Sequence, residues 1–186
     1  MQLNTINGVV MDMDGVLWRG DTVLPGVGQF FDFLRARGLP FVLASNNSSR
    51  TRADYVAKLS GMGIDGVGED QIVTSGTATV DYVRAHYPAG SPIHVLGGDG
   101  LKAMISESGY VVSDEARVVV AGIDFQLTYE RLKRATYLIH DGADFIGTNG
   151  DVTFPMADGL GPGAGSILAA LIAATGRQPV IIGKPN

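Results

Sequence analysis

The hydrophobic pattern of the chain alternates between short apolar runs and longer stretches in which apolar residues recur at helical spacing. Residues 9–13 form the first apolar run and predict a buried strand. Residues 26–37 place apolar side chains at helical spacing and stop before Gly38, which predicts a helix. The pattern then predicts a strand over 41–44, a helix over 51–62, a strand over 72–74 and a helix over 77–86.

A second series of the same kind occupies the rest of the chain. It predicts strands over 92–96, 117–121, 145–147 and 180–182, and helices over 101–108, 128–140 and 165–175. Regular alternation of strands and helices implies an α/β fold with a parallel sheet and right-handed crossovers.

Two carboxylates, Asp12 and Asp14, stand at the end of the first apolar run, directly before Gly15. Residues two apart on a strand point to the same face, and an isolated buried charge is costly, so the pair needs a partner. A divalent cation beyond the end of the sheet would make the convergence of the two side chains favourable. The alternative is a strand end whose aspartates only cap the next segment, because Asp is common in turns.

A polar run, 45–51, follows the second predicted strand, and its first five residues are small. Ligands bind beyond the carboxyl ends of strands in an open parallel sheet, so this run is expected beside Asp12 and Asp14 if the two strands are neighbours. Its hydroxyl, amide and backbone N–H groups suit an anion at a helix N-terminus. Lys184 follows the last predicted strand and can add an ammonium group. The simpler alternatives are an N-capping loop and an exposed loop lysine.

The composition narrows the classes of function. The chain has 186 residues, of which 45% are hydrophobic, no cysteine, and a formal net charge of −5. The lack of a basic surplus argues against nucleic acid as the main partner, and the lack of cysteine excludes disulfides and thiolate chemistry. We expect neither a signal peptide nor a membrane span, and therefore a cytoplasmic protein. The densest basic cluster, Arg131, Lys133 and Arg134, is expected on the solvated face of a helix.

Five segments together resemble the p-nitrophenyl phosphatase-like branch of the haloacid-dehalogenase superfamily, which is subfamily IIA with a C2-type α/β cap. In chain order the segments are DMDGVLWRG, FVLASNNSSRT, DFIGTNGDVTFP, PGAGSILAAL and IIGKPN. The resemblance spans nearly the whole chain and implies a Rossmann-like core, incomplete at its C-terminal end, with an inserted cap domain. Residues 1–78 would belong to the core, 79–178 to the cap, and 179–186 would return to the core.

The same resemblance implies a reaction. Asp12 would be the nucleophile that attacks phosphorus and forms an aspartyl-phosphate, and Asp14 would protonate the leaving alcohol and then activate water. Mg²⁺ would bind the Asp12 carboxylate and the Asp14 backbone carbonyl, and would reduce repulsion between Asp12 and the phosphate. The substrate would be a small-molecule phosphate ester.

The resemblance also implies which residues hold the substrate. Those expected to bind the phosphate group are Ser45, the amides of Asn46 and Asn47, and Lys184. In relatives the loop that corresponds to 148–155 faces the active site, so Asn149 and Phe154 are candidates for substrate contact. The alternative for this loop is a turn stabilised by Asn and Asp. A homodimer formed through the cap is also expected from the family.

One element of the family pattern is missing from the sequence. The family needs an acidic motif, G-D-x-x-x-T-D, after the lysine to supply a further metal ligand, and the chain stops at Asn186. We expect the sequence to be a fragment of a longer phosphatase; the alternatives are completion by another chain, or a protein that is not a competent catalyst. Three functions follow: a Mg-dependent phosphomonoester hydrolase, a non-catalytic phosphate-binding or regulatory module, and a phosphotransferase.

Overall fold

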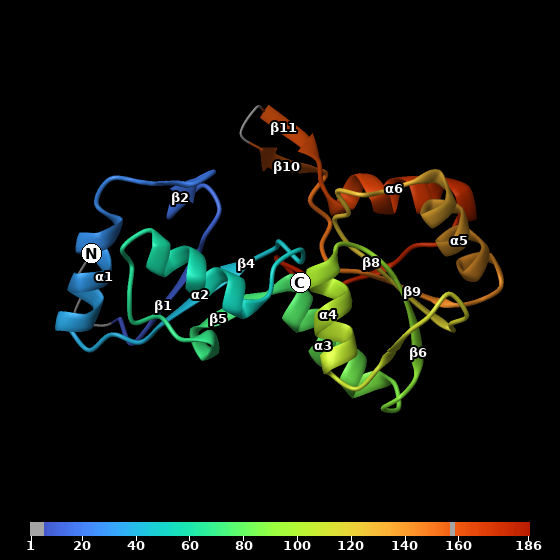
Figure 1. The fold of residues 1–186 in the computed structure, drawn as a ribbon, viewed down its shortest axis with the longest axis horizontal. Coiled ribbons are helices and arrows are strands. Elements are labelled where there is room, and N and C mark those ends of the chain that lie inside the picture. Colours follow the sequence, from blue (N-terminus) through green and yellow to red (C-terminus); the bar gives the residue numbers. More distant parts are fainter. Residues whose placement is uncertain (1–5, 157–158) are drawn as a thin grey trace. The chain divides into compact units, whose positions relative to one another are not determined.

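A computed structural model describes residues 6–156 and 159–186 (Figure 1). The chain divides into two compact units. The first comprises the residues up to Ser45 together with Arg52–Val73, and the second comprises Asn46–Thr51 and Thr74–Asn186. The predicted division into a core (1–78 and 179–186) and a cap (79–178) stays a prediction, and its first five residues lie outside the described part of the chain.

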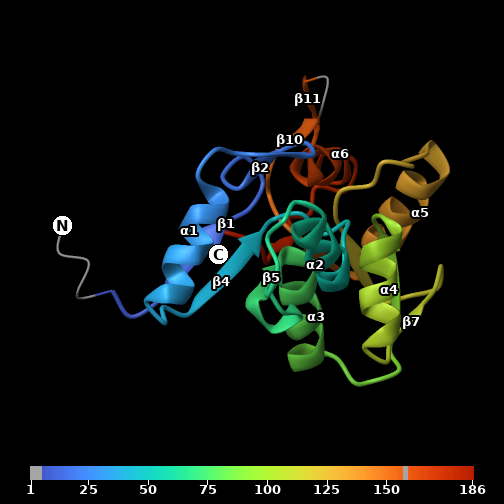
Figure 2. The same ribbon diagram turned by 60° about the vertical axis from the view of Figure 1, so that its left-hand side comes forward.

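The first unit is built on a three-stranded sheet in the order β1–β4–β5. Its strands are β1 (Val9–Asp12), β4 (Phe41–Ser45) and β5 (Ile72–Thr74), and its helices are α1 (Val27–Ala36), α2 (Arg52–Gly61) and the short 3₁₀ helix η2 (Glu69–Gln71). Strands β1 and β4 are parallel, with Asp12 opposite Ala44, so the first two predicted strands are neighbours (Figure 2). Helix α1 buries Val27, Phe31 and Leu34 because these residues share one face at helical spacing.

The second unit is built on a five-stranded parallel sheet in the order β12–β9–β8–β6–β7. Its strands are β6 (Pro92–Leu96), β7 (Val111–Val112), β8 (Val118–Ala121), β9 (Asp144–Gly147) and β12 (Val180–Ile181). Its helices are α3 (Ser75–His86), α4 (Asp99–Glu107), α5 (Tyr129–His140) and α6 (Ala164–Thr175). All four residues of β8 are buried and apolar, as expected for a central strand covered on both faces.

Two pairs of helices cover the two faces of this sheet. Helices α3 and α4 share a hydrophobic cluster with Ile93, Val95 and Val120, whereas α5 and α6 share another with Leu96 and Val119. Within one strand, neighbouring residues therefore contribute to different clusters, which follows from the alternation of side chains along a strand. The α/β architecture with a parallel sheet is the one predicted from the sequence.

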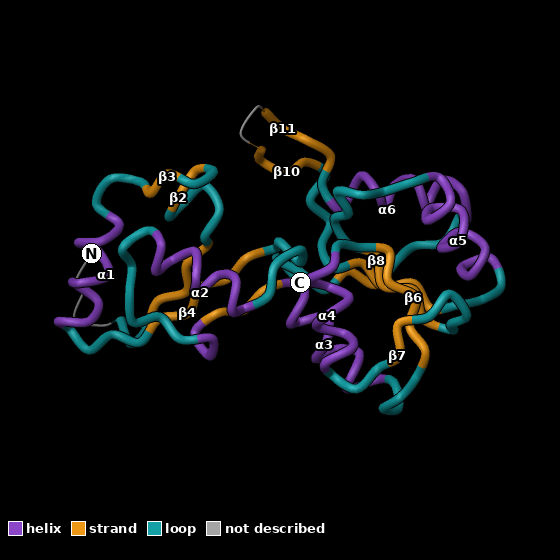
Figure 3. The backbone as a smooth tube through the Cα atoms, viewed as in Figure 1, coloured by secondary structure: helices purple, strands orange, loops and turns teal. Residues whose placement is uncertain are grey.

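Two short hairpins complete the fold (Figure 3). Strands β2 (Trp18–Arg19) and β3 (Thr22–Val23) pair in the first unit, and β10 (Thr153–Met156) and β11 (Gly159–Pro162) pair in the second. Both pairs are antiparallel, and neither was predicted. No helix among the described residues is long and apolar enough to cross a membrane.

Candidate active site

The two aspartates of the first unit lie where β1 ends and the chain turns. Asp12 is the last residue of β1 and is exposed, whereas Asp14 is half-buried in the turn that follows. Gly15 has a φ of 84°, a left-handed conformation that costs glycine little. The backbone N–H groups of Val16 and Leu17 both donate to the Met13 carbonyl, so the turn is held in place. The sheet thus presents both carboxyl groups at its carboxyl edge.

Both oxygens of the Asp14 carboxylate accept hydrogen bonds. The indole Nε1 of Trp18 donates to Oδ1 at 2.9 Å, and the Ser45 hydroxyl donates to Oδ2 at 3.1 Å. The Ser45 oxygen is also 3.3 Å from the Tyr55 hydroxyl. Two donors on two different oxygens fix the rotation of a carboxylate as well as its position. The first unit therefore brings together Asp14 and Ser45, which were both predicted, with Trp18, which was not.

The Trp18 side chain is fixed by burial and by contacts with Tyr55 and Lys58. Its side chain is buried, its ring stacks near that of Tyr55 with centroids 6.3 Å apart, and the Lys58 ammonium lies 4.8 Å from its ring centroid. Lys58 also donates to the Gly20 carbonyl at 2.9 Å. Trp18 belongs to the segment DMDGVLWRG, so the signal was present in the sequence, but its contact with Asp14 depends on the turn at Gly15.

The residues of the first unit suit Mg²⁺ in the kind of donor they supply. Mg²⁺ prefers oxygen ligands, keeps several water molecules, and is often bound through one or two carboxylates and the phosphate of a substrate. Asp12 and Asp14 offer two carboxylates together with backbone carbonyl oxygens, which matches the one or two carboxylates of such sites. Within the described residues, no group of three or more His, Cys, Asp or Glu could hold a metal ion. The family resemblance assigns Mg²⁺ to the Asp12 carboxylate and the Asp14 backbone carbonyl, and this assignment stays a prediction.

In the second unit, the polar run that begins at Asn46 meets Lys184. The Asn46 side-chain amide contacts both polar groups of the Lys184 backbone and the carboxylate of Asp151. The Asn149 amide donates to the Asn46 carbonyl at 2.7 Å, and the Asn149 Oδ1 accepts from the backbone N–H of Asp151 at 3.0 Å. Three of the predicted site residues, Asn46, Asn149 and Lys184, are thus in one cluster.

Asn47 and Ser48 are buried in the second unit. The Asn47 Oδ1 accepts hydrogen bonds from the backbone N–H and the hydroxyl of Ser49, at 2.8 and 2.7 Å. The Ser48 hydroxyl lies 3.1 Å from that of Thr148, and a Cβ on Gly122 would come within 2.7 Å of the Ser48 Oγ. The polar run is therefore packed by its own side chains and needs glycine at position 122.

Phe154 lies in β10 and is half-buried. Its ring makes an edge-to-face contact with that of Phe125, with centroids 5.8 Å apart, and Phe125 is 57% exposed. Two neighbouring aromatic rings on a partly exposed surface can contact an apolar part of a ligand. Its contact with substrate stays a prediction.

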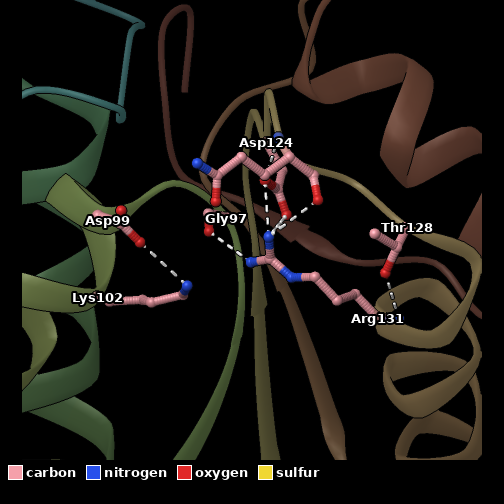
Figure 4. Close-up of polar contacts among 7 residues, drawn as sticks. Gly97, Asp99, Lys102, Asp124, Thr128 and Arg131 are labelled. Carbon is pink, nitrogen blue, oxygen red and sulfur yellow. Dashed lines mark hydrogen bonds and ion pairs between the residues drawn. The ribbon is translucent and has the colours of Figure 1, made fainter.

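An ion pair in the second unit corrects one expectation. Arg131 was expected on a solvated helix face, but its Nη1 lies 2.8 Å from Oδ2 of Asp124, whose side chain is 1% exposed, and its Nη2 donates to the Gly97 carbonyl at 2.9 Å (Figure 4). The Asp124 Oδ1 also accepts from the backbone N–H of Gln126 at 2.9 Å. The sequence pattern of α5 shows a basic face but does not show that Arg131 folds back onto a buried carboxylate in the loop that precedes the helix.

Comparison with known proteins identifies the family. The family model described as haloacid dehalogenase-like hydrolase matches residues 9–111. The acid sugar phosphatase of Staphylococcus aureus is 40% identical over 179 residues, which are 95% of this chain and 68% of that protein. The chain belongs to the haloacid dehalogenase-like hydrolases. The family and the branch expected from the motifs are confirmed.

Solved structures of other haloacid dehalogenase-like hydrolases have the same fold. A 4-nitrophenylphosphatase from Thermotoga maritima aligns with a TM-score of 0.92 and 41% identity, over 97% of this chain and 69% of that one. A glycerol phosphate phosphatase from Mycobacterium tuberculosis in complex with magnesium aligns with a TM-score of 0.89 and 27% identity, over 96% of this chain and 54% of that one. The Rossmann-like fold expected for the family is confirmed.

Proposed function

We propose that this hydrolase is a Mg²⁺-dependent phosphatase that cleaves small-molecule phosphate monoesters through an aspartyl-phosphate. The single observation that carries the proposal is the carboxyl pair at the end of β1, with Asp14 oriented by Trp18 and Ser45. A positioned acid–base group next to a carboxylate nucleophile is what this chemistry requires. The similar proteins named above as phosphatases, one of them in complex with magnesium, support the same reaction.

In the first half of the reaction, a carboxylate oxygen of Asp12 attacks phosphorus while the bond from phosphorus to the ester oxygen breaks. Asp14, in its acid form, gives a proton to the leaving oxygen, so that an alcohol departs. Trp18 and Ser45 keep the Asp14 carboxyl group at a fixed rotation during this transfer. Mg²⁺, when bound by Asp12 and the Asp14 carbonyl, supplies positive charge that reduces repulsion between the nucleophile and the phosphate.

In the second half, Asp14 takes a proton from water as the water oxygen attacks phosphorus. The bond between phosphorus and Asp12 breaks, phosphate leaves, and the Asp12 carboxylate is restored. The proton taken from water returns Asp14 to the acid form for the next cycle. The roles proposed for the other residues follow the family resemblance: Ser45, Asn46, Asn47 and Lys184 bind the phosphate oxygens.

The proposed substrates are sugar phosphates and similar small esters. Support comes from the names of the similar proteins, an acid sugar phosphatase and a glycerol phosphate phosphatase. The loop 148–155, which contains Asn149 and Phe154, is proposed to choose among leaving groups. An alanine scan of this loop is expected to change the ranking of substrates more than the turnover of an aryl phosphate.

The experiment that tests the proposal is the substitution Asp12→Asn. It keeps the size of the side chain and removes the nucleophilic carboxylate, so Mg²⁺-dependent hydrolysis of p-nitrophenyl phosphate should be lost while the fold persists. The matched control is Asp32→Asn, whose carboxylate is exposed on α1 and pairs with Arg35 on the same helix. Near-normal turnover by Asp12→Asn would refute the nucleophile. A wild-type protein that binds phosphate without turnover would favour the binding-module alternative.

A further inference from the structure

The Asn46 side chain makes three hydrogen bonds in the second unit. Its Oδ1 accepts from the Lys184 backbone N–H at 2.9 Å, and its Nδ2 donates to the Lys184 carbonyl at 3.1 Å and to the Asp151 Oδ2 at 3.0 Å. Rotating the amide by 180° would put Nδ2 against an N–H and Oδ1 against two oxygens. The hydrogen-bond network therefore fixes the orientation of this amide.

These bonds continue the backbone pairing of the last strand. After β12, Ile182 and Gly183 donate to the carbonyls of Gly147 and Thr148, at 3.1 and 2.9 Å. At Lys184 the partner of the backbone is no longer a strand but the Asn46 side chain. A side-chain amide that meets the N–H and C=O of one residue imitates a neighbouring strand. Asn46 thus extends the ordered backbone to the residue that carries the ammonium group.

Asn46 is itself anchored from two directions. Its carbonyl accepts from the Ser75 hydroxyl at 2.5 Å and from the Asn149 amide at 2.7 Å. Gly183 allows the close approach, because a Cβ there would lie 2.9 Å from the Asn46 Oδ1 and 2.8 Å from the Asn149 Cβ. The side chain that holds Lys184 is therefore part of a tightly packed cluster rather than a flexible loop.

We propose that Asn46 is a positioning residue for Lys184, acting through its side chain on the lysine backbone. The proposal rests on the proposed function, in which the Lys184 ammonium binds the substrate phosphate. It changes the role of the Asn46 side chain from a phosphate ligand to a support. Through its hydrogen bond to Asp151, the same side chain links the lysine to the loop proposed to select the leaving group, and the Asn46 backbone carbonyl adds a hydrogen bond from Asn149.

The first measurement does not depend on activity. The chain has four lysines, so selective ¹⁵N-lysine labelling gives the backbone amide signals of Lys58, Lys102, Lys133 and Lys184. In Asn46→Ala, hydrogen exchange of the Lys184 amide should quicken by about tenfold, the value of one lost hydrogen bond, while the other three amides stay unchanged.

The matched control is Asn7→Ala, which makes the same change at an exposed asparagine in the first unit, ahead of β1. It should leave the exchange of all four lysine amides as in the wild type. Unchanged Lys184 exchange in Asn46→Ala would overturn the proposal, even if the variant had lost activity.

The second measurement is a double-mutant cycle on hydrolysis of p-nitrophenyl phosphate. Asn46→Ala should lower kcat/KM on the order of 10²-fold, because a misplaced charge loses much of its effect. If Asn46 acts through Lys184, the variant Asn46→Ala/Lys184→Met should be no slower than Lys184→Met alone. If the fold-losses in kcat/KM of the two single variants multiplied in the double variant, Asn46 would bind phosphate by itself, and the proposal would be overturned.

The isosteric variant Asn46→Asp tests whether the hydrogen bonds of the Asn46 side chain, rather than its volume, position Lys184. It keeps the acceptor for the Lys184 N–H but places a carboxylate against the Lys184 carbonyl and Asp151. Its kcat/KM should fall at least as far as that of Asn46→Ala; activity near that of the wild type would contradict the proposal. A wild-type protein without any phosphatase activity would refute the proposed function, and the exchange measurement would still decide the role of Asn46.

Discussion

His94 shows the effect of burial on a single titratable side chain. It lies on β6 and is 6% exposed, with Nδ1 at 3.3 Å from the Ser113 carbonyl and 3.4 Å from the Asp114 carboxylate. Its Nε2 is buried and has no hydrogen-bond partner among the described residues. Burial lowers the pKa of His94; the Ser113 carbonyl and Asp114 oppose this, and Arg134 and Arg131 add to it. The folded protein therefore favours the neutral ring.

This lowered pKa predicts a loss of stability in acid. Unfolded histidine titrates near a pKa of about 6.5, so the unfolded chain takes up the proton first as the pH falls. The free energy of unfolding should therefore decline as the pH drops below about 6.5. In His94→Gln this part of the decline should disappear. Urea unfolding of both proteins between about pH 5 and pH 8 measures the slopes, and equal slopes would contradict the prediction.

The residues of the candidate site were found from the sequence only in part. Asp12 and Asp14 were predicted because carboxylates at the end of a buried apolar run are costly without a partner, and Ser45 was predicted because it opens the polar run after the second strand. Trp18 was missed because its hydrogen bond to Asp14 depends on the turn around Gly15, which no local pattern specifies. The support given by the Asn46 side chain was also missed, since its partners are more than 100 positions away in the chain.

At the scale of helices and strands, long periodic segments were predicted well. Helix α5 begins after Thr128, whose side chain accepts from the Arg131 N–H, and α6 ends before Gly176, which has a φ of 68°. Both are ordinary helix signals, a Thr N-cap and a left-handed glycine. The hairpin of β10 and β11 was missed because its strands contain proline and glycine, which are rare within strands.

The ion pair between Arg131 and Asp124 gives a prediction about how α5 is fixed. Arg131→Met leaves a buried carboxylate without its cation, which should lower the free energy of unfolding by about 3–5 kcal/mol. Lys133→Met is the matched control, because its ion pair with Glu130 lies on the surface of the same helix and its loss should leave the free energy of unfolding nearly unchanged. Urea unfolding of the two variants measures the difference.

A double variant tests whether the stability lost in Arg131→Met comes from the ion pair or only from the packing of the Arg131 side chain. Arg131→Met/Asp124→Leu removes both charges, so it should recover much of the stability lost in Arg131→Met. If the loss of stability in the double variant equalled the sum of the losses in Arg131→Met and Asp124→Leu, the ion pair would not be the reason for the loss.

For the whole molecule, the hydrophobic clusters follow the division into two units. One cluster, which includes Leu43 and Phe31, lies entirely in the first unit, and the two others lie on opposite faces of the sheet in the second. Strand order and the membership of 46–51 in the second unit were not predictable, because they depend on contacts between distant segments rather than on local periodicity.

This division predicts separate responses to core substitutions. Leu43→Ala leaves a cavity in the first unit and should remove about 2–5 kcal/mol of its stability. Hydrogen exchange should then quicken in β1 and β4 while β8 and β9 keep their protection. Val120→Ala, in the second unit, should give the reverse pattern. Equal loss of protection in both sheets, for either variant, would show that the two units open together.

The hairpin of β10 and β11 is a place where the chain can be altered without disturbing the parallel sheet. Within the described residues these strands pair only with each other and form no ladder with the five-stranded sheet. Their junction with the rest of the unit is marked by the hydrogen bond from the Gly163 N–H to the Val152 carbonyl, at 2.8 Å. An engineer can therefore graft a foreign hairpin between these two positions, changing its length and side chains, without shifting the register of any strand in the parallel sheet.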